Sequence, residues 1–144
     1  MSFAFHDLLK RLMGGAVAIC IALSLILAPI GATAQASGAL MSGDYVNDTV
    51  SVAHSLQETI AIPRDEEGRE EAENEAVQLI TAYISRYRNR SQVNKSLSYT
   101  TMQTALNAMA GHYKTFKNRP LPEQLKERLN KELAKAEALA NQES

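Results

Sequence analysis

The sequence predicts an all-α protein, an antiparallel up-down-up-down four-helix bundle preceded by an apolar signal segment. Along four segments of the 144 residues, apolar side chains recur at steps of three and four. That spacing places them on one face of a helix at about 100° per residue. Strand signals, such as alternating apolar runs and Asn-Gly turns, are absent. Because the breaks between segments are short, neighbouring helices are expected to pack antiparallel.

The first 36 residues have the three parts of a secretory signal. Lys10 and Arg11 end a short basic leader, and Leu12–Ile30 carries no charge. Ala34 and Ala36 both satisfy the small-x-small rule, so cleavage is expected after one of them. The alternative is an uncleaved anchor, because the 19 uncharged residues could span about 28 Å at roughly 1.5 Å per residue.

The only cysteine, Cys20, lies inside the apolar stretch. Signal cleavage would remove it, so the mature chain is expected to have no disulfide and no catalytic thiolate. A lipoprotein signal places the lipidated cysteine directly after a small residue. The branched Ile19 precedes Cys20, which disfavours lipidation.

Residues 37–44 are small and polar and are expected to form a flexible leader, followed by one domain over residues 45–144. The first expected helix runs from Tyr45 to Ala61 and is stopped by Pro63. Its apolar stripe consists of Tyr45, Thr49, Val52, Ala53, Leu56 and Ile60.

The second expected helix begins in the acidic run Asp65–Glu75, with Gly68 in its first turns, and continues to about Asn89. Acids at its start and arginines at its end complement the helix dipole. Its stripe consists of Ala72, Ala76, Leu79, Ile80, Tyr83, Ile84 and Tyr87.

A polar loop, Gln92–Leu97, precedes the third expected helix, for which Ser98 is the expected N-cap. The third stripe consists of Met102, Ala105, Leu106, Met109, Ala110, Tyr113 and Phe116. Asn118–Leu121 breaks this helix, and Pro122 is expected in the first turn of the fourth, where its missing N–H has no cost. The fourth stripe consists of Leu125, Leu129, Leu133, Ala136 and Ala140.

Charge is unevenly distributed along the chain. Residues 35–75 carry ten acids and two bases, whereas residues 76–144 carry eleven bases and five acids. The asymmetry suggests a bipolar surface that orients a partner, although part of it reflects the charges of helix ends. An exported and weakly acidic protein is not expected to bind nucleic acid.

The mature chain offers little for catalysis or for a cofactor. Its histidines are His54, expected to face water, and His112, on the flank of the third stripe. Met109 and His112 could ligate haem, but a second ligand on a facing helix is lacking, so a core methionine beside a boundary histidine is favoured. The acidic run lacks the rigid loop that hard cations prefer. We therefore expect no enzyme, no cofactor and no metal, with a periplasmic haem- or metal-binding bundle as the alternative function.

Six basic side chains are candidates for binding a partner. Arg86, Arg88 and Arg90 end the second helix, and Lys114, Lys117 and Arg119 follow at the end of the third. An antiparallel bundle places these two clusters at opposite ends, so they need not form one patch. The alternative is that they are solvated helix C-termini.

Three segments in order resemble a known family. They are Tyr83–Arg88, Thr100–Asn107 and Arg119–Glu123, the last followed by Leu125-Lys126 and Arg128-Leu129. Over about residues 43–137 the chain resembles the small lumenal assembly factors numbered twenty-seven among photosystem II proteins, found in cyanobacteria and plastids. The cyanobacterial members are usually lipoproteins, and this chain departs from them because no cysteine follows its signal.

The resemblance implies a photosystem II assembly and repair factor in the thylakoid lumen, peripheral on the lumenal side of the membrane. It implies transient binding to incompletely assembled photosystem II, on the large lumenal loop of the smaller inner antenna subunit. There the family is thought to keep the extrinsic subunits away until the manganese cluster is built. The signal, with no added transit peptide, suggests a cyanobacterial or plastid-encoded gene.

Overall fold

The computed structural model describes residues 40–117 and 119–144, and within them it contains four α-helices and no strand. The predicted fold class is confirmed. The helices are α3 (Tyr45–Ala61), α4 (Arg69–Tyr87), α5 (Leu97–Thr115) and α6 (Glu123–Gln142). The predicted signal segment, with Cys20 and the cleavage candidates Ala34 and Ala36, lies outside the described residues.

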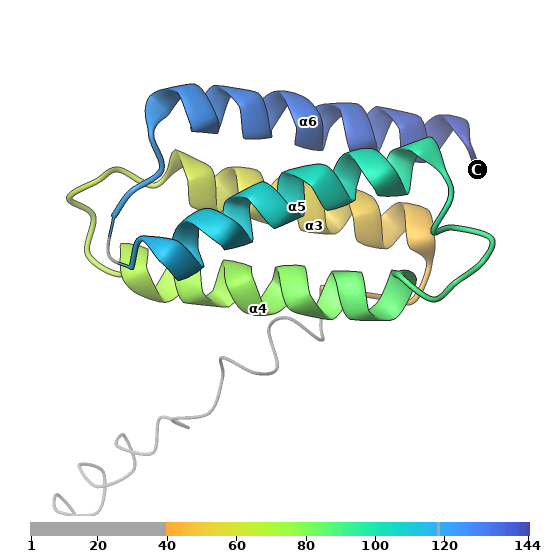
Figure 1. Cartoon of the computed structure of the whole chain (residues 1–144), viewed down its shortest axis with the longest axis horizontal. Helices are drawn as coiled ribbons and strands as arrows, with labels where there is room; N and C mark the ends of the chain where they lie inside the picture. The colour runs from red at the N-terminus through yellow and green to blue at the C-terminus, as the bar shows by residue number, and fades with distance from the viewer. Residues whose placement is uncertain (1–39, 118) are drawn as a thin grey trace, which may run out of the picture. The chain divides into compact units, whose positions relative to one another are not determined.

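The helices alternate in direction, and each packs on two others (Figure 1). α3 contacts α4 and α6, and α5 contacts the same two helices, so α3 and α5 lie on one diagonal of the bundle. One end therefore carries the start of α3, the end of α4, the start of α5 and the end of α6. We call it the arginine end, and the opposite end, where α4 starts and α5 ends, the lysine end.

The core is built from the predicted stripes. Val52, Leu56, Met102, Leu106 and Leu129 are fully buried. The remaining buried apolar residues come from the same stripes, with three exceptions. These are Tyr99 of α5 and two residues outside the helices, Met41 and Leu121. At about 25 cal/mol per Å² of apolar area, burial of this kind is the main stabilising contribution in a domain of this size.

Phe116 does not belong to the core, contrary to its place in the predicted stripe. It follows the last residue of α5 as the C-cap, with φ −117° and ψ 67°, and its side chain is 45% exposed. Because α5 ends at Thr115, Phe116 does not follow the helical periodicity that would place its side chain in the core.

The starts of three helices differ from the prediction. Gly68 precedes α4 as its N-cap with a φ of +87°, a left-handed conformation that glycine adopts without strain, so it is not in the first turns. Pro122 is the N-cap of α6 and lies one residue before the first turn. The N-cap of α5 is Ser96, whose hydroxyl accepts a hydrogen bond from the Tyr99 amide at 3.1 Å.

Ser98, the predicted cap, is instead fully buried in a hydrogen-bond chain across three helices. It donates to the Glu143 carboxylate at the end of α6. Since its proton is used there, Ser98 accepts from the Tyr45 hydroxyl of α3, at 2.6 Å. The buried hydroxyl thus joins α3, α5 and α6 at the arginine end.

The role of Ser96 as the N-cap of α5 can be tested by stability measurements. Ser96→Ala is expected to lower the free energy of unfolding by about 1 kcal/mol, because the Tyr99 amide loses its partner at the helix start. Urea titration followed by circular dichroism measures the change. Ser91→Ala, in the exposed loop before the cap, is the control and should stay within about 0.5 kcal/mol of wild type. Equal stability of all three proteins would contradict the assignment of the cap.

Candidate interaction surfaces

A buried carboxylate organises the arginine end. Asp48 is 1% exposed and accepts hydrogen bonds from the Tyr87 hydroxyl at 2.6 Å, from the Ser42 amide at 2.6 Å and from the Ser42 hydroxyl at 2.9 Å. Both Ser42 groups donate to Oδ1, whereas Tyr87 donates to Oδ2. The Gly43 amide also donates to Oδ2, at 3.1 Å, and the Arg86 guanidinium lies 3.6 Å from the same oxygen. A buried charge is tolerated only when it is paired in this way.

These contacts fasten the segment before α3 to the bundle. We call residues 40–44 the strap. Met41 is 8% exposed and belongs to the core, and the strap's Gly43 carbonyl accepts a hydrogen bond from Arg90 at 3.3 Å. The sequence predicts a flexible leader over residues 37–44, and its described part is held on the bundle by Asp48 of α3 and by Arg90, which follows α4.

Two pKa shifts reflect this arrangement. Burial acts to raise the pKa of Asp48, but the hydrogen bonds from Tyr87, Ser42 and Gly43 outweigh it and bring the pKa below its ordinary value of 3.8. The pKa of the Tyr87 hydroxyl is raised by burial and by its hydrogen bond to Asp48. Asp48 is therefore ionised and Tyr87 protonated at neutral pH, the states that their hydrogen bond requires.

The three candidate arginines differ in what they contact. Arg86 is half-buried beside Asp48, and Arg90 both binds the strap and lies over the Tyr87 ring at 4.8 Å. Arg88 is exposed, and no ion pair joins its guanidinium to another described residue. Arg86 and Arg90 thus have structural contacts, and Arg88 is the arginine most available to a partner.

The other three candidates lie at the lysine end, as the antiparallel order requires. Lys114 and Lys117 are exposed, and Arg119 lies over the exposed Phe116 ring at 5.9 Å. His112 also contacts the Phe116 ring, at 5.2 Å between centroids, and its Nε2 is 3.1 Å from the Arg119 carbonyl oxygen. An aromatic ring, an arginine and two lysines are therefore available on this part of the surface.

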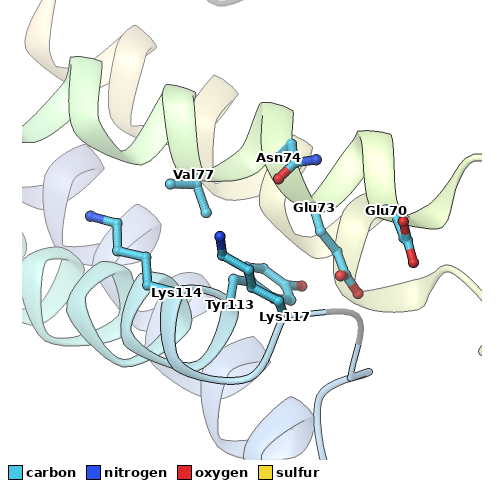
Figure 2. Close-up of a pocket in the computed structure, with 7 residues that line it drawn as sticks. All are labelled: Glu70, Glu73, Asn74, Val77, Tyr113, Lys114 and Lys117. Carbon is cyan, nitrogen blue, oxygen red and sulfur yellow. The ribbon is translucent and has the colours of Figure 1, made fainter.

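A pocket of about 320 Å³ lies between the start of α4 and the end of α5 (Figure 2). It is lined by Glu70, Glu73, Asn74 and Val77 on one side and by Tyr113, Lys114 and Lys117 on the other. Sequence reasoning missed it because its walls are about 40 residues apart in the chain. Lys114 and Lys117 were predicted as partner-binding candidates from their charge alone.

The expected bipolar surface is more mixed in the structure. The acidic run that opens α4 lies at the lysine end, where Glu70 and Glu73 line the same pocket as Lys114 and Lys117. Acids and bases that are separated along the sequence are therefore brought together there, while the arginine cluster lies at the far end. Any orientation of a partner by charge must come from these local clusters.

The residues weighed for other chemistry have ordinary contacts. Exposed His54 lies 3.3 Å from the Glu137 carboxylate, and Met109 is 1% exposed within the core. Within residues 40–117 and 119–144, no three His, Cys, Asp or Glu side chains are grouped so that they could hold a metal ion. No helix in the described part of the chain is long and apolar enough to cross a membrane.

Comparison with known proteins identifies the relatives of this bundle. The sequence profile of the family described as Photosystem II Pbs27 matches residues 10–139, which is most of the chain. The chain belongs to the photosystem II Psb27 family. The resemblance noted in the three sequence segments is thereby confirmed.

Two members of the family show the degree of sequence identity. The photosystem II lipoprotein Psb27 of Synechocystis sp. is 45% identical over 117 residues, which cover 81% of this chain and 87% of that protein. The photosystem II assembly factor lipoprotein Psb27 of Thermosynechococcus vestitus is 38% identical over 104 residues, 72% of this chain and 78% of that protein. The names of both describe lipoproteins of photosystem II.

Solved structures of Psb27 have the same fold. The solution structure of Psb27 from cyanobacterial photosystem II matches with a TM-score of 0.68 and 41% identity, over 72% of this chain and 90% of that one. The crystal structure of PSB27 from Arabidopsis thaliana matches with a TM-score of 0.66 and 25% identity, over 69% and 98%. The four-helix bundle is thus the fold of this family in both lineages.

Proposed function

We propose that this protein is an assembly and repair factor of photosystem II, without catalytic activity, that binds incompletely assembled complexes and then leaves. Membership of the Psb27 family over residues 10–139 is the observation that carries the proposal. Curated relatives are named a photosystem II assembly factor in Thermosynechococcus vestitus and a photosystem II repair protein in Arabidopsis thaliana.

The finer proposal names the partner and the consequence of binding. The protein binds the large lumenal loop of the smaller inner antenna subunit and keeps the extrinsic subunits off while the manganese cluster is built. It acts in the thylakoid lumen, peripheral to the membrane, after cleavage of its signal following Ala34 or Ala36. It takes no cofactor and no metal.

The described structure is suited to such a role. A packed core gives a rigid bundle, so little conformational entropy is lost on binding. Exposed basic side chains at both ends, Arg88 at one and Lys114 and Lys117 at the other, are available for steering a partner. Exposed polar side chains of this kind suit the modest, polar interfaces that are typical of transient complexes.

Affinity purification from thylakoid membranes tests the proposal. A C-terminally tagged chain is expected to co-purify with photosystem II complexes that lack the extrinsic subunits, and to be absent from complexes that carry them. An added excess of purified extrinsic subunits should not join the tagged complex. Recovery of the tag only on fully assembled complexes, or away from photosystem II altogether, would overturn it.

Arg88 provides a test of steering that leaves the fold intact, unlike Arg86 and Arg90 with their structural contacts. Arg88→Glu is expected to slow association with the lumenal-loop polypeptide several-fold at low salt, because charges at an interface rim act mainly on the association rate. Surface plasmon resonance measures the rate. The difference from wild type should shrink at high salt, where the Debye length falls from about 10 Å at 0.1 M to about 3 Å at 1 M.

Lys135→Glu is the control for that measurement. It makes the same change of charge at an exposed position in the middle of α6, away from both bundle ends. It should leave the association rate close to that of wild type. If both variants slow association equally, the effect comes from the net charge of the protein, and Arg88 does not lie at the rim of the interface.

A further inference from the structure

The pocket at the lysine end has an unbalanced set of charges. Glu73 is buried and paired with Arg69, whose Nη1 lies 2.6 Å from a Glu73 carboxylate oxygen. That pairing leaves Glu70 as the carboxylate without a partner in the lining. Lys114 and Lys117 form no ion pair with another described residue. The lining, taken with Arg69, therefore has one positive charge in excess.

The pocket also offers neutral hydrogen-bond donors. Asn74 contributes a side-chain amide from α4, and Tyr113 contributes a hydroxyl from α5 (Figure 2). Burial raises the pKa of the Tyr113 hydroxyl, and the negative charge of Glu73 raises it further, so the group remains protonated and can donate. Two ammonium groups, an amide and a phenol together are the partners that a carboxylate prefers.

We propose that this pocket receives an acidic side chain from an extended segment of the partner, held between the ammonium groups of Lys114 and Lys117. The inference rests on the proposed function, because it adds a contact with the partner at the opposite end of the bundle from Arg88. A basic side chain would meet two unpaired ammonium groups and only Glu70 to offset them. An acidic one meets the excess positive charge and the two neutral donors.

Phe116 gives the docked segment an apolar contact next to the pocket. It directly precedes Lys117 in the chain, is 45% exposed, and has the Arg119 guanidinium over its ring. Exposed aromatic and arginine side chains are the types most often found at the energetic centre of interfaces. At the arginine end, by contrast, Arg86 and Arg90 already bind Asp48 and the strap.

The test uses a pair of variants with a matched control pair. Lys114→Gln with Lys117→Gln removes both pocket lysine charges, and Lys131→Gln with Lys135→Gln removes two exposed lysines of α6. The two lysines are three residues apart in the pocket pair and four apart in the control pair. Binding to thylakoid membranes that hold assembly intermediates is measured by sedimentation. The pocket pair is expected to bind about tenfold more weakly than wild type, while the control pair binds like wild type. Circular dichroism should show that all three proteins are equally helical.

A second measurement separates this inference from the proposed function. Acetylated hexaglutamate is titrated into the ¹⁵N-labelled protein, with acetylated hexaserine as the neutral peptide. Hexaglutamate should shift the amide signals of Asn74, Tyr113 and Lys114 in wild type and in the control pair, and should not do so in the pocket pair. If the wild-type protein does not bind the membranes but shows these shifts, the proposed function is contradicted. The inference that the pocket binds a carboxylate is supported all the same.

Two results would overturn the inference itself. One is full binding of the pocket pair to the membranes where wild type also binds. The other is a pattern of hexaglutamate shifts centred away from the pocket, or shared equally with the lysines of α6. Either would show that the pocket does not select an acidic segment.

Discussion

Asp48→Ala is expected to lower the free energy of unfolding by about 3–5 kcal/mol, because it leaves the partners of a buried charge without a counterpart. Tyr87 loses its acceptor inside the core, and the Ser42 and Gly43 amides lose theirs. Arg86 is left beside an empty site. Domains of this kind are stable by roughly 5–15 kcal/mol in total, so the loss is a large fraction. Urea unfolding at neutral pH measures it.

The pH dependence of stability identifies the charge as the cause. Because the folded pKa of Asp48 lies below its ordinary value of 3.8, ionised Asp48 stabilises the fold fully above that value. The stabilisation is lost as the pH falls through the lower, folded pKa. Asp48→Asn should therefore be less stable than wild type at neutral pH, with the difference shrinking in acid. A constant difference across the whole pH range would show that shape, and not charge, accounts for the role of Asp48.

Leu106→Ala is expected to lower the free energy of unfolding by about 2–5 kcal/mol, since the lost methyl groups leave a cavity that the bundle can only partly fill. Leu106 is fully buried in α5, among side chains from the stripes of the other helices. Chemical denaturation followed by circular dichroism gives the change directly.

Leu97→Ala is the matched control, because it removes the same atoms from the same helix at a position that is 56% exposed. It should change the free energy of unfolding by no more than about 0.5 kcal/mol. A similar loss for Leu97→Ala and Leu106→Ala would mean that helix propensity, and not core packing, sets the stability of α5.

The helices and their buried stripes could be predicted from sequence because helical periodicity is a local signal. Val52, Leu56 and Leu106 follow it and are buried. The prediction was wrong where a helix boundary decides the outcome. Phe116 falls just beyond α5 and is exposed, and Ser96 caps α5 because the helix starts one residue before Ser98. Both serines are suitable caps, and propensity alone cannot choose between them.

The arrangement around Asp48 could be predicted only in part. Asp48 lies three residues after Tyr45 and four before Val52, on the face of the helix that carries the first stripe, but the predicted stripe did not include it. Nothing in the sequence names a partner for Asp48, because Tyr87 is 39 residues away and the strap has no periodicity. The pocket at the lysine end is beyond sequence reasoning for the same reason, since packing alone brings Asn74 beside Lys114.

The attachment of the strap sets where the independently folding unit begins. A recombinant chain that starts at Tyr45 keeps all four helices but lacks Met41 and the Ser42 and Gly43 amides that donate hydrogen bonds to Asp48. Such a truncation leaves the buried Asp48 carboxylate with only Tyr87 and Arg86 as partners, and it leaves a gap where Met41 packs against the core. Affinity tags, fluorescent fusions and protease sites therefore belong upstream of Leu40, or at the C-terminus.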